Sequence, residues 1–467
     1  MASNTIYDAI IVGAGVSGSF IARELTDAGM KCVLVEAGRH YAPDQYPTNE
    51  LDSNAQLYWG GGVELNTDAS IGFLRPRAVG GGSVVNQALL DRFDDLAFDE
   101  WRDVSGVDFL SREQMDPYYD RAAERFEMRS VPEEYRNGNA EVFRTGFEAN
   151  GYLSAPLIRA QRDCRFDRGN SCIVCLAGCP ISSKQSTSTS VLPAAFENGL
   201  ELESEFEVGR VTSRPDGVEV QGRDRHGETR SLRGARLILA CGAIGNSQLL
   251  LASGFGDKLP ALGQNFWTHP QYMQLGIFDE PVDAQYGPMQ SYKSADPGFR
   301  RRGFKLENVY APPVALSMLL PGFGRRHQDA MRLQRHYACI EVCVRDTSPG
   351  RIRVARNGRA TITKSLNDED RRRRDRGLDA IRNIFHATGV KEIVSGSIAI
   401  GLHLMGGCGL GTDSGRSVVA PDFRVHGLPN VWAADSSIFP TSPGINPSYT
   451  IMALALRGAD SIVAGAR

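Results

Sequence analysis

Apolar positions near the start of the chain change their spacing twice, and this pattern predicts a strand, a turn, a helix and a second strand. Residues 8–12 form a short apolar run, residues 20–25 repeat apolar positions at helical spacing, and residues 31–35 are apolar again. The turn after the first run has the order G-x-G-x-x-G and supplies three glycines, Gly13, Gly15 and Gly18. A strand, a glycine turn and a helix in this order are typical of a dinucleotide-binding unit.

The residue types of this unit suit the parts of a dinucleotide. In such a turn the first glycine permits the bend, the second lets a pyrophosphate approach the backbone, and the third lets the helix pack on the strand. The first N–H groups of the helix can bind phosphate. Glu36 ends the second strand, where a carboxylate accepts hydrogen bonds from ribose hydroxyls and repels a 2′-phosphate. We therefore expect an adenosine dinucleotide other than NADP.

Further strand and helix patterns follow along the chain. Apolar runs and alternations predict strands at 218–220, 237–240, 337–344 and 351–354. A helix is predicted after Asn367, a good capping residue, because three apolar side chains fall on one of its faces, Leu378, Ile381 and Phe385. At 467 residues the chain exceeds the usual size of a single hydrophobic core, so we expect two domains.

Composition narrows the class of protein. A formal net charge of −3 argues against a general nucleic-acid or membrane surface. The apolar runs are far shorter than the ~18 residues of a membrane span, and the first residues lack the basic start and apolar core of a signal peptide. We therefore expect a cytoplasmic protein that binds small molecules and not nucleic acid.

Three of the nine cysteines form a C-x₂-C-x₃-C pattern, Cys172, Cys175 and Cys179, with Cys164 upstream. Thiolates are the ligands that zinc and iron–sulfur centres prefer, but a structural zinc site needs four ligands. The favoured interpretation is a packed thiol turn near the cofactor. A metal or iron–sulfur centre remains the alternative.

A second glycine cluster lies at 80–82 and precedes Ser83 and Asn86. Such glycines allow a backbone to approach a ligand closely, and the helix that begins here points its N–H groups at it. The segment resembles the GGSSxxN signature of the glucose–methanol–choline (GMC) oxidoreductases. Gly82 replaces the first serine of that signature, and Arg77 best matches the arginine that precedes it. The resemblance implies that this loop lies against a flavin and that the cofactor is FAD.

The C-terminal third carries the other part of the resemblance. His403 precedes a glycine-rich stretch, as does the active-site histidine of the family, and Asn446 matches the position that holds asparagine or a second histidine. Asp435 matches the acid near the ribityl and pyrophosphate groups. The segment from Pro447 to Thr450 opens the final helix, whose N-terminus can stabilise negative charge on the flavin. Val208 falls where the family has a valine whose backbone meets the adenine.

Alcohol oxidation explains why these residue types are useful. The hydroxyl proton must be removed while hydride passes from carbon to the flavin N5, and a neutral imidazole can accept that proton near pH 7. We therefore predict His403 as the base and Asn446 as a donor that positions the substrate oxygen. An isolated histidine among apolar residues is more often structural, but the surrounding motif favours catalysis here.

The resemblance also implies a fold. We expect an FAD-binding α/β domain on a parallel sheet, assembled from 1–90, 186–275 and 404–467, and a substrate domain on a mostly antiparallel sheet, from 91–185 and 276–403. The predicted cofactor contacts are Gly13, Gly15, Gly18, Glu36, Arg77, Gly81, Gly82, Ser83, Asn86, Val208, Asp435, Pro447 and Thr450.

The expected function is FAD-dependent oxidation of a CH–OH group in a small alcohol, sugar, glycoside or natural-product intermediate. Dioxygen or another acceptor would reoxidise the flavin. Three alternatives remain at this level: a non-redox lyase of the same family, a dehydrogenase that passes electrons through a cluster at the cysteine motif, and a non-catalytic FAD-binding protein.

Overall fold

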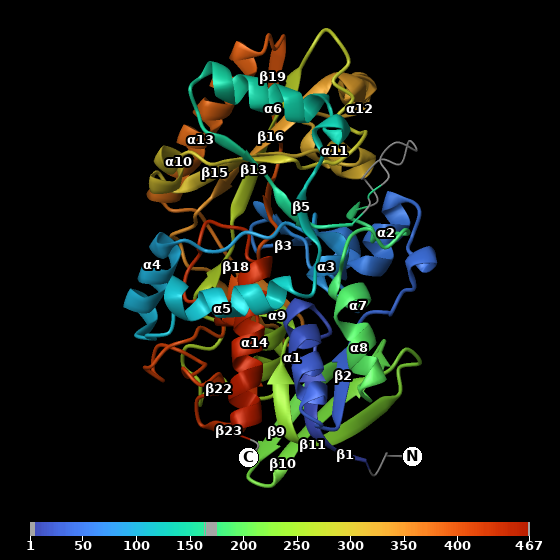
Figure 1. Cartoon of the computed structure of the whole chain (residues 1–467), viewed down its shortest axis with the longest axis vertical. Coiled ribbons are helices and arrows are strands. Elements are labelled where there is room, and N and C mark those ends of the chain that lie inside the picture. The colour runs from blue at the N-terminus through green and yellow to red at the C-terminus, as the bar shows by residue number, and fades with distance from the viewer. Residues whose placement is uncertain (1–4, 163, 165–174, 466–467) are drawn as a thin grey trace.

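The computed structural model describes residues 5–162, 164 and 175–465. Two sheets lie one above the other along the long axis of the molecule, with the two ends of the chain at its lower end (Figure 1). The lower half contains the predicted dinucleotide unit, and the upper half contains the strands of the middle of the sequence. Within the described residues, no helix has the length and apolar character that a membrane crossing requires.

The lower sheet has eight strands, of which five are parallel. Across the sheet these five are β23 (Leu428–Ala433), β11 (Thr229–Leu239), β1 (Ile6–Val12), β2 (Cys32–Glu36) and β8 (Glu201–Ser204). Three antiparallel strands extend the sheet. The strand β22 (Arg424–Val425) pairs with β23, β10 (Gly217–Arg223) pairs with β11, and β9 (Glu207–Arg214) pairs with β10. The central strands are apolar and buried on both faces, as expected for a parallel sheet covered by helices.

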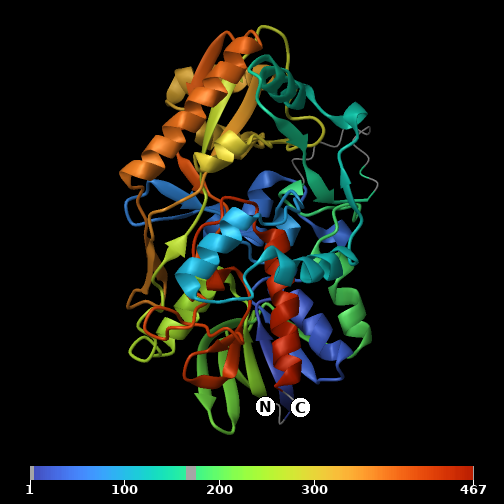
Figure 2. The same cartoon turned by 60° about the vertical axis from the view of Figure 1, so that its left-hand side comes forward.

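Helices cover this sheet. Figure 2 shows α14 (Ser448–Ala464) running beside α1 (Val16–Asp27), and α14 also packs on α5 (Arg112–Ala123). The close packing of α1 on the sheet depends on Gly18, because a Cβ there would lie 1.9 Å from the Gly13 carbonyl oxygen. The third glycine of the predicted motif therefore has the packing role expected of it.

The upper sheet has nine strands and is mostly antiparallel. Its main path is β3 (Glu64–Leu65), β4 (Ile71–Phe73), β20 (Ala399–Gly401), β13 (Pro270–Ile277), β16 (Tyr337–Val344), β15 (Phe304–Asn308), β14 (Tyr292–Ser294) and β6 (Ser154–Pro156), and β19 (Glu392–Ser395) also pairs with β13. The helices α6 (Gly138–Ala149) and α13 (Asp368–Ala387) pack on it. Asn367 caps α13, as predicted, by accepting a 2.8 Å hydrogen bond from Asp370 N.

The remaining helices and strands are short and connect or flank the two sheets. They are α2 (Glu50–Leu57), α3 (Gly82–Val85), α4 (Asp95–Ser105), α7 (Thr187–Ser190), α8 (Leu192–Glu197), α9 (Gly242–Ala252), α10 (Pro297–Arg301), α11 (Pro313–Leu319), α12 (Gly324–Arg332), β5 (Met128–Ser130), β7 (Ile158–Ala160), β12 (Phe266–Trp267), β17 (Arg351–Val354), β18 (Ala360–Thr363) and β21 (Met405–Gly406).

Some segments of the chain join the other sheet than the predicted domain ranges place them in. Strands β3 and β4 fall in the predicted 1–90 segment, but β3 pairs with β4 and β4 pairs with β20 of the upper sheet. Helices α4 and α5 fall in 91–185, yet Trp101 and Tyr119 belong to the hydrophobic core of the lower sheet. The Trp101 indole also donates to the Thr441 carbonyl at 3.1 Å. Pairing and core packing between distant segments decide these boundaries.

Candidate active site and cofactor cradle

A cavity of about 1400 Å³ extends from the carboxyl ends of β1 and β2 to the upper sheet. One end is lined by the glycines of the predicted dinucleotide turn, and the other by side chains of β13, β15 and β16. Its volume exceeds the roughly 300–1,000 Å³ of an ordinary small-ligand pocket. The cavity is thus large enough for a long cofactor together with a substrate.

The two predicted glycine clusters meet at the cofactor end. Gly80 N donates to the Ala14 carbonyl at 2.7 Å. A Cβ at Gly81 would lie 2.6 Å from the Cα of Gly15, and Gly13 has φ +105°. Bare backbone from both turns therefore faces the cavity, which is the environment that a pyrophosphate or a flat ring needs.

The half-buried Glu36 and the buried Asp435 supply carboxylates to this end of the cavity. Glu36 accepts 2.9 Å hydrogen bonds from the backbone N–H groups of Ala14 and Gly38. Asp435 accepts from Gly242 N at 2.7 Å, among other donors. Burial raises the pKa of both carboxyls, and these N–H donors act in the opposite direction. The donors fix the orientation of both side chains at the edge of the cavity.

Most of the predicted cofactor residues line the cavity, namely Gly13, Gly15, Glu36, Gly81, Gly82, Asn86, Val208, Asp435 and Pro447. Two glycine turns without side chains, two oriented carboxylates and the start of α14 together fit the pyrophosphate, ribose and ring parts of FAD.

Four residues predicted to contact the cofactor do not line the cavity, and their contacts stay predictions: Gly18, Arg77, Ser83 and Thr450. Gly18 serves helix packing, as described above. The Ser83 hydroxyl donates to the Gly80 carbonyl, and the Thr450 hydroxyl contacts the buried Tyr119 hydroxyl at 2.5 Å. The Arg77 guanidinium lies over the Trp59 ring, 4.7 Å from its centroid. These side chains are held by other protein groups and shape the loops that form the cradle.

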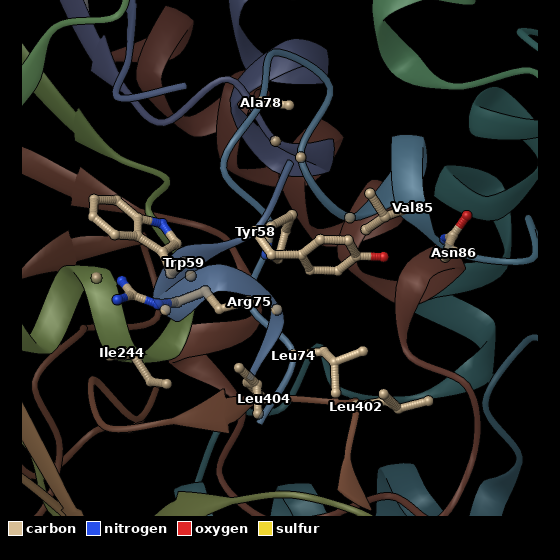
Figure 3. A pocket seen from close by; sticks show the side chains of 18 of the residues that line it. Tyr58, Trp59, Leu74, Arg75, Ala78, Val85, Asn86, Ile244, Leu402 and Leu404 are labelled. Carbon is tan, nitrogen blue, oxygen red and sulfur yellow. The ribbon is translucent and has the colours of Figure 1, made fainter. Parts of the chain in front are cut away.

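Sequence reasoning missed Arg75, which lines the cavity two residues before Arg77. Its guanidinium binds both carboxylate oxygens of Glu64 at 2.7 and 2.8 Å and lies 4.5 Å from the Trp59 ring centroid. Figure 3 shows Trp59 and Arg75 on one side of this part of the cavity, and Tyr58 and Asn86 towards the other. The nearby glycines at 60–62 were the available signal in the sequence.

His403 lines the cavity and is held by a second histidine that the sequence did not single out. Nδ1 of His403 lies 2.8 Å from Nδ1 of the fully buried His269. Nε2 of His269 accepts a 2.8 Å hydrogen bond from Gly444 N. Burial, together with the positive charge of Lys305, lowers the pKa of His403 to about 3, and burial likewise holds the pKa of His269 well below 6.5. Both rings are therefore neutral at pH 7.

Asn446 lies in the same cavity, within a network of charged groups from β15. Its Oδ1 accepts from Lys305 Nζ at 2.7 Å, and its Nδ2 donates to Glu307 at 3.1 Å and to Asp91 at 3.4 Å. Burial alone would lower the pKa of Lys305, but the Glu307 carboxylate at 2.7 Å and other acidic groups raise it above its usual value. Lys305 therefore stays charged beside Asn446 and His403.

The cysteine motif is only partly within the described residues, because Cys172 lies outside them. The Cys179 thiol accepts from Lys184 N at 3.4 Å, and the Cys175 thiol lies 3.9 Å from the Arg159 guanidinium. Elsewhere in the described chain, three potential metal ligands lie close together, namely His269, Cys343 and His403. One ligand atom from each lies within 4.8 Å of the other two. The Nδ1 atoms of the two histidines are only 2.8 Å apart, a hydrogen-bond distance.

Comparison with known proteins agrees with this site. The family models for GMC oxidoreductases match residues 54–271 and 346–455, and a model of an NAD(P)-binding Rossmann-like domain matches residues 11–66. An uncharacterized GMC-type oxidoreductase of Mycobacterium tuberculosis is 29% identical over 99% of this chain and 76% of its own length. A long-chain-alcohol oxidase of Arabidopsis thaliana is 27% identical over 96% of this chain and 67% of its own length.

A solved structure shares the fold. The crystal structure of pyridoxine 4-oxidase from Mesorbium loti superposes with a TM-score of 0.76, at 18% identity, over 97% of this chain and 98% of that one. The predicted α/β FAD-binding sheet and the antiparallel second sheet are confirmed. The glycine cradle, the two oriented carboxylates and the two matching family models show that this chain is an FAD-dependent oxidoreductase of the GMC family.

Proposed function

We propose that this protein oxidises the CH–OH group of a small-molecule alcohol, with His403 as the proton acceptor and Asn446 as the group that holds the reacting oxygen. Bound FAD supplies the hydride acceptor. The observation that carries the proposal is the buried Gly444–His269–His403 chain, which opens onto the same cavity as Asn446 and the glycine cradle. A neutral, rigidly held imidazole beside a cofactor site suits proton removal from an alcohol.

Proton transfer to His403 depends on where the protons of the histidine pair lie. Because Gly444 N–H donates to Nε2 of His269, a neutral His269 carries its proton on Nδ1 and directs it to His403. The proton of His403 then lies on Nε2. To accept a proton there, His403 must first donate from Nδ1 to His269 instead, which gives up the Gly444 hydrogen bond.

The cost of that rearrangement decides whether the base role is feasible. Losing a buried hydrogen bond costs about 1–3 kcal/mol, or roughly 5- to 150-fold in population. A positioned general base contributes about 10²–10⁴-fold to the rate. The rate gained from the base exceeds the population lost to the rearrangement over most of these two ranges, so we retain His403 as the base. His269 determines how large that loss is.

Asn446 can free one N–H for the substrate at small expense. The contact from Nδ2 to Asp91 is the longest of its three hydrogen bonds, at 3.4 Å, and Asp91 is also paired with Lys293. A substrate oxygen that takes the place of the Asp91 carboxylate at this N–H therefore leaves no carboxylate unpaired. Lys305 and Glu307 keep the amide plane in place through the two shorter contacts.

The substituted enzyme His403→Ala tests the proposal. Mixed anaerobically with alcohols, it should retain FAD but lose flavin bleaching by a factor of about 10²–10⁴. The matched control, His226→Ala, removes an exposed histidine that does not line the cavity and should bleach normally. Admitting oxygen afterwards distinguishes dioxygen from another electron acceptor. Equal bleaching by the two variants would exclude His403 as the base.

A further inference from the structure

The floor of the cavity is one face of the upper sheet, and most of the side chains on this face are polar. Across the sheet, Glu307 of β15 lies opposite Glu341 of β16, and Glu341 lies opposite Met273 of β13. The next row, two residues away, contains Gln271 of β13. Residues two apart on a strand share a face, and these four all line the cavity. The face continues directly from Asn446, which is hydrogen-bonded to Glu307.

Two acceptors on this floor have no hydrogen-bond partner among the residues that the structure describes. They are Oε2 of Glu341 and Oε1 of Gln271, and each residue is 1% exposed. The other polar atom of Gln271 has only a long contact, 3.9 Å, with the Cys343 thiol. A buried acceptor without a partner costs about 1–3 kcal/mol. Acceptors that line a cavity can recover this free energy when a ligand brings donors to them.

The protonation state of the floor indicates the kind of donor. Burial, and then the negative charge of Glu307, raise the pKa of Glu341 well above 4.5. This shift favours the protonated carboxyl, which can donate its O–H to Glu307 and keep one oxygen as an acceptor. A ligand ammonium here would meet neutral acceptors and the nearby charge of Lys305, which already binds Glu307. Neutral hydroxyl groups meet no such repulsion.

We propose that Glu341 and Gln271 form a hydroxyl-binding subsite, and that the substrate is a polyhydroxylated, sugar-like alcohol rather than an unbranched long-chain alcohol. The proposal rests on the proposed function, because it places the reacting hydroxyl at His403 and Asn446. An alkyl chain on this floor would leave both acceptors unpaired. A second and a third hydroxyl group of the same substrate would pair them.

Substitutions of Glu341 distinguish a neutral acceptor from an ionised one. Glutamine can donate to Glu307 and still present a carbonyl oxygen, so Glu341→Gln should stay within about threefold of the unsubstituted enzyme. Glu341→Leu has no acceptor and should lose about 10- to 100-fold in kcat/KM for polyols. In Glu341→Leu the ratio of kcat/KM for a polyol to kcat/KM for an unbranched alcohol of equal length should fall, whereas Glu341→Gln should keep this ratio.

Gln271→Met provides a second test with a matched control on the same strand. Gln274 is equally buried and also has an unpartnered Oε1, but it does not line the cavity. Gln271→Met should weaken polyol binding about 10-fold by isothermal titration with an unreactive deoxy analogue, whereas Gln274→Met should not. This pair remains informative if Glu341→Leu fails to fold, as judged by its FAD content and melting temperature.

The outcomes separate this proposal from the proposed function. If no alcohol bleaches the flavin of the unsubstituted enzyme, the proposed function fails. If alcohols bleach it but Glu341→Leu and Gln271→Met leave polyol turnover and binding unchanged, only the subsite is refuted. If Glu341→Gln is as impaired as Glu341→Leu and amino alcohols are preferred, the floor binds ammonium groups through an ionised carboxylate, and the hydroxyl subsite is wrong.

Discussion

The neutral state of His403 makes a specific prediction about pH. The perturbation is acidification from pH 8 to pH 5 during flavin reduction. An imidazole with the ordinary pKa of 6.5 would be neutral in only about 3% of molecules at pH 5, so a rate that needs the neutral form would fall about 30-fold. Burial and Lys305 lower the pKa of His403 to about 3. His403 would then be about 99% neutral at pH 5, and the rate should stay level.

The assay is anaerobic stopped-flow measurement of flavin bleaching at saturating alcohol, from pH 5 to pH 8. His403→Ala supplies the control, because any slope that remains in this variant comes from another group. A fall of about 30-fold with an apparent pKa near 6.5, absent from His403→Ala, would refute the reasoning. It would mean that His403 exchanges freely with water instead of lying in the desolvated pair with His269.

Two further predictions concern stability and the cofactor. The pKa of His403 is lower in the folded protein than in the unfolded chain, so unfolding takes up a proton below pH 6.5. The free energy of unfolding therefore decreases as the pH falls. The free energy of unfolding of the cofactor-free protein, measured in urea, should therefore fall by about 1.6 kcal/mol more between pH 6.5 and pH 5 than that of His403→Asn, and equal falls would contradict this. Glu36→Ala should weaken FAD retention roughly 10- to 100-fold without changing which alcohol is preferred, and a changed preference would place Glu36 at the chemistry instead.

The parts of the structure that were predictable are those fixed by local patterns. The glycine turn, the strand at Tyr337–Val344 and the cap at Asn367 each depend on a few consecutive residues, and the structure has all three. A short-range pattern specifies backbone conformation because bends, caps and apolar periodicity act within a few residues of one another.

The residues that the sequence left open depend instead on contacts between distant segments. Arg77 was chosen by alignment to a motif, but Arg75 is the arginine of this loop that lines the cavity, and both guanidinium groups lie over the Trp59 ring. His269 had only a weak local signal, the His-Pro pair that it forms with Pro270, although it lies against His403 across 134 positions of sequence. Glu341 was visible in the sequence as a charged residue within the apolar run 337–344. Its position on the cavity depends on which strands pair with that run.

The sequence alone determined the class of cofactor, the family and the catalytic candidates, because glycine turns and short motifs carry that information locally. Tertiary structure decided the proton arrangement of His403 and the character of the substrate floor. Gly444 and His269 reach His403 from separate segments. The register of β13 and β16 places Gln271 and Glu341 on one face in neighbouring rows, and each has one acceptor oxygen that no described residue pairs. Strand register and burial are properties of the folded chain, and they determine which polar atoms remain for a substrate.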